Sequence, residues 1–452
     1  MSAGVRTSRE PDNLDVRDLM NVAPKSMHVC DDGTVTLGGI PLTDLADEFG
    51  TALFVVDAEH FRGRLREYKS AFAELWPQSS VVYAAKALCT VATDRIVAEE
   101  GCSIDVASGG ELAFAKAAGF PMSRVVAQGN NKTPTEIAEC LDAGVGLFVV
   151  DTHEELERIS EAALSRGMRQ EVVLRICPGV EADTHAFIQT ANEDSKFGFN
   201  ITCGAARKAT ELALSLDGID LAGYHCHIGS QIFNLDSYVE AVGVMFRFMD
   251  EMRGEFGFTA RTLDVGGGLG IAYLAGEVPP TVRDFAETLT GAVREKCDIY
   301  DYPAPHLCVE PGRSVAANAG ITLYTVGSVK ETPGICTYVA VDGGMTDNIR
   351  TALYGSEYEA FVVERATEPR SIICDIVGKH CESGDIVVRN SSLGLCRAGE
   401  HICVLGTGAY CHEMASNYNK QVRPGIVMVE GGEAREIVRR ETYDDLLRRE
   451  VM

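Results

Sequence analysis

Short apolar runs rich in β-branched residues alternate with helix-like stretches through the middle of the chain. The first four runs begin about 22 residues apart, which is a regular β/α repeat. An open doubly wound sheet would show the same alternation, but eight units are what a closed parallel barrel needs. The repeat therefore predicts an α/β fold and favours a TIM-type (β/α)8 barrel. The runs that look like buried parallel strands are 81–87, 103–108, 125–130, 147–151, 172–177, 221–228, 262–265 and 307–310.

The sequence changes character after about residue 314, where strand-like runs follow one another without helices between them. This pattern predicts a second, mostly β domain, built as a barrel or a sandwich. The stretch 27–42 has the same hairpin character. We therefore expect residues 1–50 to join the β domain, the barrel to span 51–313, and the β domain to span 314–452, with a charged terminal helix at 435–452. The runs in question are 321–329, 337–341, 359–363, 371–377, 401–405 and 426–430.

The charge of the chain argues against two classes of partner. Lys and Arg number 41 against 66 Asp and Glu, a formal net charge of −25, and such a field repels phosphate backbones and anionic membrane surfaces. We therefore expect neither nucleic acid nor a membrane as a partner. The N-terminal sequence lacks the apolar core of a signal peptide, and no apolar run is long enough to span a bilayer, which predicts a cytoplasmic protein. The 15 Cys are scattered through apolar runs and are interpreted as reduced core residues.

Lys86 stands at the end of the first predicted barrel strand. Because strand residues alternate between faces, Val82, Ala84 and Lys86 are expected on one face. Burying an unpaired ammonium group costs on the order of several kcal/mol, so a lysine has little structural use there. The active sites of this barrel lie at the carboxyl ends of the strands, which makes Lys86 a candidate reactive amine. The alternative is a lysine that extends from the strand end into solvent.

A glycine-rich turn follows the seventh predicted strand. Its consecutive glycines, Gly266, Gly267 and Gly268, allow backbone N–H groups to approach an anion closely. The loops after strands seven and eight are the recurrent phosphate site of this barrel. The turn lacks the spacing of a dinucleotide fingerprint and the Lys of a P-loop. The alternative is a tight turn without a ligand.

Glu310, Pro311, Gly312 and Arg313 end the eighth predicted strand. A carboxylate half-buried at this point requires a cationic partner. One interpretation is an ion pair between Glu310 and Arg313. The other is that Glu310 holds a protonated ring nitrogen while Arg313 binds an anion through its bidentate fork.

His225, Cys226 and His227 end the sixth predicted strand, and Ser230 follows them. Two His and one Cys suggest zinc, but adjacent strand residues point to opposite faces and cannot converge on one ion. We therefore expect no metal here, and instead a flat imidazole that faces the barrel mouth.

Three polar segments of the β domain, 347–354, 379–385 and 406–410, are candidate substrate contacts, because loops on a rigid scaffold often carry function. Within the first, Arg350 and Tyr354 are four residues apart and would share one face of a helical turn. The alternative for each segment is an exposed polar loop without a function.

Taken together, these motifs resemble those of the barrel-type, fold type III pyridoxal phosphate-dependent decarboxylases, which share an alanine racemase-like architecture. The likeness runs from about residue 54 to residue 447. The segments at 347–354 and 381–385 resemble the diaminopimelate branch rather than the ornithine or arginine branches. The motifs, in order, are Tyr83 to Ala87, Asp105 to Leu112, Gly129 to Lys132, His225 to Gln231, Gly266 to Gly268, Glu310 to Arg313, Val341 to Tyr354, Cys381 to Asp385 and Gly408 to Tyr410.

The resemblance implies pyridoxal 5'-phosphate as the cofactor. Lys86 would bind it covalently, Glu310 would hold its ring nitrogen, and His227 would stack on its ring. Further contacts to the cofactor are implied for Asp105, Ser230, Gly266, Gly267, Gly268, Pro311, Gly312, Arg313 and Tyr410.

For the substrate, the resemblance implies that Glu382 binds a distal amino group and that Cys381 protonates the α-carbon. In this family these two residues reach the active site of the other subunit, so a homodimer with shared active sites is implied. The residues that would receive a distal carboxylate are Arg313, Arg350 and Tyr354, and Tyr410 is a further implied substrate contact.

The activity implied is decarboxylation of meso-2,6-diaminopimelate to L-lysine and CO2, the last step of lysine biosynthesis. One alternative is a decarboxylase of another basic amino acid (lysine, ornithine or arginine), which would leave Arg313 and Arg350 without a distal carboxylate to hold. Another is a catalytically silent relative. A racemase on the same barrel is disfavoured, because it would place an arginine against the ring nitrogen where this chain has Glu310.

Overall fold

The computed structural model describes residues 10–180 and 196–451, which form two compact units. We call Arg62–Ile271 with Pro279–Val315 the barrel unit. We call Met1–Phe61, Ala272–Val278 and Ala316–Met452 the β unit. The β unit is therefore assembled from both ends of the chain and a short insert from its middle.

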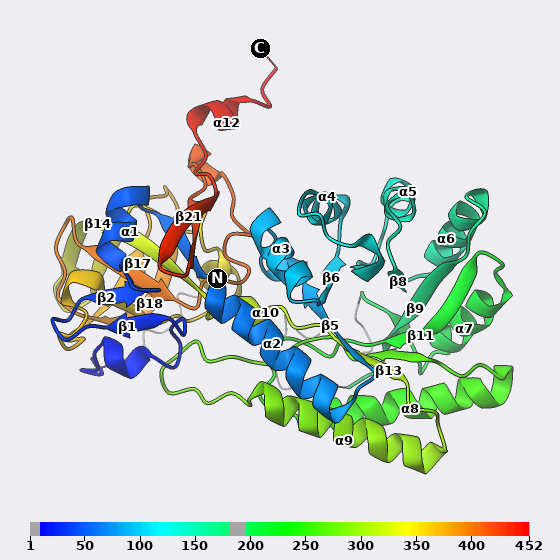
Figure 1. The fold of residues 1–452 in the computed structure, drawn as a ribbon. Coiled ribbons are helices and arrows are strands. Elements are labelled where there is room, and N and C mark those ends of the chain that lie inside the picture. The colour runs from blue at the N-terminus through cyan, green and yellow to red at the C-terminus, as the bar shows by residue number, and fades with distance from the viewer. Residues whose placement is uncertain (1–9, 181–195, 452) are drawn as a thin grey trace. The chain divides into compact units, whose positions relative to one another are not determined.

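The barrel unit is a closed ring of eight parallel strands (Figure 1). The strand order is β5-β6-β7-β8-β9-β11-β12-β13, and β13 pairs back with β5. A short β10 (Phe199–Asn200) lies beside β9. The eight predicted strands and the TIM-type barrel are thereby confirmed. Their bounds are β5 (Ser79–Ala84), β6 (Ser103–Val106), β7 (Val125–Ala127), β8 (Leu147–Val150), β9 (Gln170–Cys177), β11 (Ile219–His225), β12 (Thr262–Asp264) and β13 (His306–Val309).

Helices lie outside the strands of this unit (Figure 1), so the strands are covered and read as continuous apolar runs. Short side chains fill the barrel interior, among them Val82, Val126, Val173 and Cys308. Hydroxyl residues such as Thr90, which caps α3, set where several helices begin. The helices are α2 (Ala58–Leu75), α3 (Val91–Glu99), α4 (Gly109–Ala117), α5 (Pro134–Ala143), α6 (His153–Ser165), α7 (Ala205–Ser215), α8 (Asp236–Phe256), α9 (Val282–Tyr300) and α10 (Arg313–Ala316).

The β unit is organised around the long strand β14. Its main sheet has the order β18-β17-β15-β14-β4-β20-β21, with β19 also pairing with β14 and β16 pairing with β19. A small sheet, β1-β2-β3, packs its apolar side chains into the same core, where Leu37 joins Val55, Leu323 and Val427. The bounds are β1 (Met27–Val29), β2 (Val35–Leu37), β3 (Ile40–Pro41), α1 (Leu42–Phe49), β4 (Leu53–Asp57), β14 (Gly320–Thr332), β15 (Cys336–Val341), α11 (Arg350–Tyr354), β16 (Ala360–Val362), β17 (Ile372–Val377), β18 (Ile386–Leu393), β19 (His401–Leu405), β20 (Gly425–Glu430), β21 (Glu433–Val438) and α12 (Tyr443–Leu447).

Strand β4 differs from the sequence expectation, which placed the barrel at 51–313. It pairs with β14 and β20 and so belongs to the β unit. All five of its residues are buried, and a strand buried on both faces reads the same in either kind of sheet. From the sequence, these residues fall in the expected barrel range with no strand predicted here, and the partners of the strand lie far along the chain.

The expected terminal helix at 435–452 is wrong over its first part. Residues Glu433–Val438 form the edge strand β21, and only Tyr443–Leu447 are helical within the described residues. The six residues of β21 are exposed or half-buried, so they carry the charge typical of an edge strand rather than an apolar stripe. Gly431 and Gly432, with φ of +60° and +81°, form the tight turn from β20 to β21.

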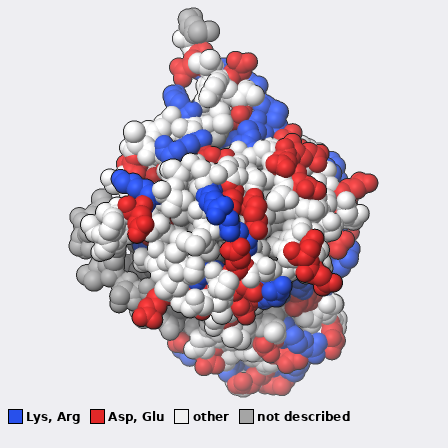
Figure 2. Space-filling view, turned by 90° about the vertical axis from the view of Figure 1, so that its left-hand side faces the viewer, with Lys and Arg blue, Asp and Glu red and all other residues white. Residues whose placement is uncertain are grey.

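Acidic and basic side chains are interspersed on the face of the molecule that Figure 2 shows. None of the described helices is both long and apolar enough to cross a membrane.

Candidate active site

Lys86 lies in a single 3-10 turn, η2 (Ala85–Ala87), that follows β5 directly. Because β5 ends at Ala84, strand alternation does not reach Lys86, and the predicted shared face with Val82 is wrong for this residue. Its side chain is exposed whereas Ala85 and Ala87 are buried. The turn therefore presents the amine at the carboxyl end of β5, where active sites of this barrel lie.

Asp105 on β6 anchors this turn. Its buried carboxyl group accepts a hydrogen bond from the backbone N–H of Ala85, next to Lys86. Burial, together with the negative charge of Glu310, raises the pKa of Asp105 well above its ordinary value. Asp105 is thus a neutral buried carboxyl group that fixes the backbone carrying Lys86.

Glu310, directly after β13, is held from two sides. Gln128, just after β7, donates from Nε2 to Oε1 over 2.5 Å. His225, the last residue of β11, lies with Nε2 3.1 Å from Oε2. The described contacts of Glu310 do not include Arg313, so the interpretation of a simple Glu310–Arg313 ion pair is wrong. The carboxylate is oriented by uncharged donors and keeps its own charge.

The protonation states around Glu310 follow from burial and from nearby charges. Burial would raise the pKa of Glu310, but its interactions with His225 and the charge of Lys86 outweigh burial and hold that pKa below the ordinary range. Burial lowers the pKa of His225, so the neutral imidazole donates its Nε2–H to Glu310 at neutral pH. The result is an ionised carboxylate at the barrel mouth.

Asp264, at the end of β12, is the neutral neighbour of this carboxylate. Burial and the charge of Glu310 raise the pKa of Asp264 well above its ordinary value. Its Oδ1 accepts the Gly266 N–H over 2.8 Å. Asp264 is therefore a neutral buried carboxyl group that fixes the start of the glycine turn.

Among the described residues, one group of three has ligand atoms close enough to hold a metal ion: His225, Asp264 and Glu310, whose atoms lie within 4.8 Å of one another. Within this group, His225 and Glu310 are already hydrogen-bonded to each other. The trio considered from sequence, His225, Cys226 and His227, is not such a group.

His227 follows β11, and its Nδ1 accepts the Gly267 N–H over 3.2 Å. This contact assigns the ring proton to Nε2 in the neutral form. Burial and the positive charge of Lys86 lower the pKa of His227 well below its ordinary value. A neutral ring of fixed tautomer can stack against a planar ligand without adding charge.

Close backbone packing leaves no room for a side chain at Gly267 or Gly268 of the glycine turn. A Cβ atom at Gly267 would lie 2.0 Å from the Glu310 carbonyl oxygen, and one at Gly268 would lie 2.4 Å from the Gly229 carbonyl oxygen. The glycines therefore let the ends of β11, β12 and β13 meet. The Gly268 N–H donates no hydrogen bond within the described chain.

Arg313 and Ser230 adjoin this turn. The Nε and Nη2 atoms of Arg313 donate to the Ser230 Oγ over 3.1 and 3.0 Å. The Pro311 carbonyl accepts the Ala84 N–H over 3.1 Å, and a Cβ atom at Gly312 would lie 2.9 Å from the Ala84 Cβ. The loop after β13 is thus tied to the end of β5.

The functional groups that the barrel unit brings together fit pyridoxal phosphate. Glu310 offers a carboxylate to a protonated ring nitrogen, and Lys86 offers an amine to a carbonyl carbon. Arg313, Ser230 and the Gly268 N–H offer donors to a phosphate group. Sequence reasoning missed Gln128 and the role of His225 behind Glu310, although a polar residue directly after β7 was a signal that could have found Gln128.

In the β unit, Arg350 on α11 lies beside tyrosines. Its Cζ is 5.4 Å from the ring centre of Tyr354 and 5.3 Å from that of Tyr410. Its Nε donates to the Tyr358 hydroxyl over 2.9 Å. Arg350 is only 7% exposed and forms no ion pair with a described residue. The structure thus brings together Arg350, Tyr354 and Tyr410, and adds Tyr358, which sequence reasoning did not single out.

Cys381 and Glu382 lie on another loop of the β unit, between β17 and β18, and both are exposed. His380 is fixed by Asp385, with Nδ1 2.8 Å from Oδ2. The Cys381 N–H donates to the Asn419 Oδ1 over 3.0 Å. The loop is therefore held at its base while its two candidate side chains face outward.

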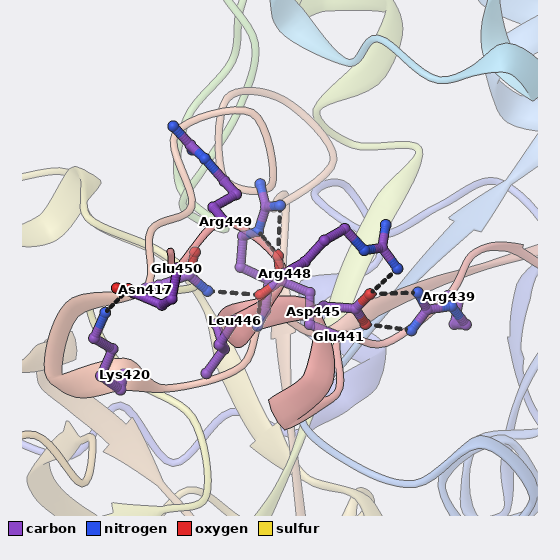
Figure 3. Close-up of a pocket in the computed structure, with 10 residues that line it drawn as sticks. Asn417, Lys420, Arg439, Glu441, Asp445, Leu446, Arg448, Arg449 and Glu450 are labelled. Carbon is purple, nitrogen blue, oxygen red and sulfur yellow. Dashed lines mark hydrogen bonds and ion pairs between the residues drawn. The ribbon is translucent and has the colours of Figure 1, made fainter. Parts of the chain in front are cut away.

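A surface pocket of about 630 Å³ near the C-terminus has a different character (Figure 3). Its arginines face acidic side chains of the same pocket: Arg439 pairs with Asp445 over 2.6 Å and Arg423 with Glu441 over 2.6 Å. Most of the charges are therefore already paired, and the pocket carries none of the groups described above.

Comparison with known protein families gives one match that covers more than half of the chain. The family described as "pyridoxal-dependent decarboxylase, pyridoxal binding domain" matches residues 59–317. That range contains Lys86, Glu310 and Arg313.

Individual proteins give a concordant result over nearly the whole chain. The diaminopimelate decarboxylase of Mycobacterium tuberculosis is 45% identical over 440 residues, 95% of this chain and 98% of the relative. That of Bacillus subtilis is 44% identical over 416 residues, 92% and 95% of the two chains. A crystal structure of the M. jannaschii diaminopimelate decarboxylase has a TM-score of 0.89 at 33% identity, covering 96% of this chain and 99% of that one. The Helicobacter pylori enzyme, solved with L-lysine, has a TM-score of 0.81 at 29% identity over 90% and 98% of the two chains.

Proposed function

This chain belongs to the diaminopimelate decarboxylases of the pyridoxal-dependent decarboxylase family, and from that membership we propose how its residues divide the reaction among them. The enzyme uses pyridoxal phosphate, removes one carboxyl group from meso-2,6-diaminopimelate and releases CO2 and L-lysine, the last step of lysine biosynthesis. The observation that carries the chemistry is the ionised Glu310, held by Gln128 and His225 near the charge of Lys86.

The barrel residues hold and tune the cofactor. When bound, pyridoxal phosphate supplies an electron-accepting ring that stabilises the charge left on the α-carbon as CO2 departs. Lys86 holds the cofactor covalently, and Glu310 keeps the ring nitrogen protonated. His227 packs against the ring as a neutral imidazole, and Asp105 fixes the turn that carries Lys86.

The phosphate group requires donors at a point away from the reacting carbon. The barrel unit offers Arg313, Ser230 and the Gly268 N–H. The backbone around these donors fixes their positions, and the hydroxyl group of Tyr410 in the β unit is proposed as a further donor to the phosphate. The full set proposed for cofactor contact is Lys86, Asp105, His227, Ser230, Gly266, Gly267, Gly268, Glu310, Pro311, Gly312, Arg313 and Tyr410.

The distal end of the substrate carries a carboxylate and an amino group. Arg350 is a buried cation without an anionic partner in the described chain, and burial of an unpaired charge is unfavourable unless a ligand compensates it. We assign the distal carboxylate to Arg350 with Arg313 and Tyr354, and Tyr410, whose ring lies beside Arg350, is a further substrate contact. Glu382 takes the distal amino group.

Decarboxylation ends when a proton is delivered to the α-carbon. Cys381 is the proposed donor: its thiol is exposed on a loop held at its base by Asn419 and by the His380–Asp385 pair. The enzyme is proposed to work as a homodimer with shared active sites, in which Cys381 and Glu382 complete the site of the partner subunit, and to reside in the cytoplasm.

The test is product analysis with the protein loaded with pyridoxal phosphate. We mix it separately with meso-diaminopimelate, lysine, ornithine and arginine, follow CO2 and identify the amine product. The expected result is CO2 and L-lysine from diaminopimelate alone, with no turnover by Lys86→Ala. CO2 from lysine, ornithine or arginine instead would establish a decarboxylase of another basic amino acid. No CO2 from any of them would establish a catalytically silent relative.

A further inference from the structure

The charge of the Arg350 guanidinium is not compensated by an acidic side chain among the described residues. Its partners are the hydroxyl groups of Tyr358 and Ser356 and the rings of Tyr354 and Tyr410. Burial raises the pKa of Tyr358 well above its ordinary value, so its hydroxyl stays uncharged. A neutral acceptor can orient a guanidinium without neutralising it, which a carboxylate cannot do.

The two hydroxyl groups occupy one edge of the planar guanidinium. The Nε–H donates to the Tyr358 Oη over 2.9 Å, and Nη2 lies 3.4 Å from the Ser356 Oγ. The remaining nitrogen, Nη1, has no hydrogen-bond partner in the described chain, and it is not among that chain's buried unpartnered atoms. Nη1 is therefore the accessible end of the group.

Tyr358 is itself held in place. It is 3% exposed, its ring meets that of Tyr273 edge to face with centres 5.4 Å apart, and its hydroxyl lies 3.8 Å from the Cys411 Sγ. Since the Tyr358 oxygen accepts from Arg350, its own proton is free to point toward the sulfur. The hydroxyl is thus a fixed acceptor at one end of Arg350.

We propose that Tyr358, with a smaller contribution from Ser356, is a positioning residue for substrate specificity, which orients Arg350 so that Nη1 meets the distal carboxylate of the substrate. The inference rests on the role proposed for Arg350 above. It predicts that Tyr358 affects binding of ligands that carry the distal carboxylate and leaves ligands without it unaffected.

Two ligands that differ only in the distal carboxylate test this prediction. Removal of one carboxyl group from diaminopimelate leaves lysine, which retains the carboxylate that was not attacked, and cadaverine is the same diamine chain without it. We titrate enzyme loaded with pyridoxal phosphate with each ligand in a calorimeter. Tyr358→Phe is expected to weaken the binding of lysine about tenfold, which is the order of one charge-assisted hydrogen bond. The affinity for cadaverine should stay unchanged. The KM for diaminopimelate rises by the same factor with kcat nearly constant, because substrate and transition state lose the contact equally.

Two further variants complete the design. Tyr324→Phe removes another fully buried tyrosine hydroxyl of the β unit, which has no hydrogen-bond partner in the described chain. This variant is expected to leave the affinity for both ligands unchanged. Ser356→Ala is expected to weaken the binding of lysine less than Tyr358→Phe does, because the contact between Ser356 and Arg350 is longer.

Equal weakening of lysine and cadaverine by Tyr358→Phe would show a merely structural role and overturn the inference. So would an unchanged affinity for both ligands. A wild-type enzyme that binds lysine no more tightly than cadaverine, with Arg350→Met also without effect, would instead overturn the role proposed for Arg350.

Discussion

Three buried carboxyl groups meet at the barrel mouth, and they do not share one protonation state. Glu310 is ionised, whereas Asp105 and Asp264 have pKa values raised by burial and by the charge of Glu310. A protonated Asp264 has the hydrogen-bonding capacity of an asparagine, with one oxygen that accepts the Gly266 N–H and one group that can donate. Neutral neighbours let one carboxylate keep its charge inside the protein.

Asp264→Asn is therefore expected to fold and to change how stability depends on pH. Native Asp264 keeps a proton that the unfolded chain releases above about pH 4. The free energy of unfolding thus falls as pH rises from that value toward the raised native pKa, by about 1.4 kcal/mol per pH unit for one proton. The variant lacks this proton, so its melting temperature should fall less steeply than that of the wild type between about pH 4.5 and 7.

A surface aspartate provides the control for this series. Asp142 is hydrogen-bonded to Arg166, which lowers its pKa, so Asp142→Asn is not expected to flatten the same part of the curve. Parallel melting curves for wild type and Asp264→Asn across this range would show that Asp264 is already ionised in the native protein.

At the scale of the strands and helices, the glycine turn after β12 is where packing is tightest. Gly267→Ala would place a Cβ atom 2.0 Å from the Glu310 carbonyl oxygen, a backbone atom that cannot rotate away. The end of β13 must move, and Glu310 moves with it. We expect a lower melting temperature and weaker binding of pyridoxal phosphate, measured by dialysis and absorbance of the retained cofactor.

Gly291→Ala is the matched control. Gly291 is exposed within α9 and has nothing within 4 Å of an added Cβ atom. The substitution is expected to stabilise the protein by roughly 0.5–1 kcal/mol through helix propensity, without changing cofactor binding. If Gly267→Ala bound the cofactor as tightly as Gly291→Ala, the turn would not control the position of Glu310.

A buried ion pair ties together the elements around β7 and β8. The Lys132 Nζ donates to the Glu155 Oε1 over 2.6 Å and to the carbonyl oxygens of Gly129 and Val149. Both charged side chains are almost fully buried. Lys132→Met leaves the Glu155 carboxylate buried without its cation and is expected to cost about 3–5 kcal/mol. The double variant with Glu155→Gln should recover much of that loss in chemical unfolding, and equal losses in both variants would contradict this account.

The elements that the sequence predicted are those whose signal is local. All eight barrel strands were recovered because covered parallel strands read as continuous apolar runs separated by helices. β4 was assigned to the barrel because its partners, β14 and β20, lie far along the chain and leave no trace in its own five residues. The edge strand β21 was missed because its charged side chains resemble an exposed helix.

The site residues, too, could be predicted from the sequence only where their signal is local. Lys86 and Glu310 were found because a charged residue at the end of an apolar run is conspicuous in sequence, whereas Arg350 was singled out in a polar segment by its spacing to Tyr354. Gln128 and Tyr358 were missed because their importance comes from contacts with Glu310, far along the chain, and with Arg350, across the end of α11. The shared face predicted for Val82 and Lys86 failed because β5 turns into η2 one residue before Lys86.

At the scale of the whole molecule, the proposed site residues come from both units. Lys86, Glu310 and Arg313 belong to the barrel unit, whereas Arg350 and Cys381 belong to the β unit. The β unit in turn needs both ends of the chain, since β4 lies between β14 and β20 in one sheet. The chain must therefore be synthesised almost to its end before the β unit can assemble.

The proposal of shared active sites predicts complementation between two inactive variants. Lys86→Ala removes the amine that holds the cofactor, and Cys381→Ala removes the proposed proton donor. If Cys381 serves the partner subunit, a dimer with one subunit of each kind contains one intact site and one site that lacks both groups. Equal mixing after dissociation and reassociation makes half of the dimers mixed, so about a quarter of wild-type activity should return in a two-fold symmetric assembly. Each variant taken alone through the same procedure is the control. If the mixture stays as inactive as its components while size measurements show that subunits have exchanged, Cys381 acts within its own subunit, and the proposed sharing of sites is wrong.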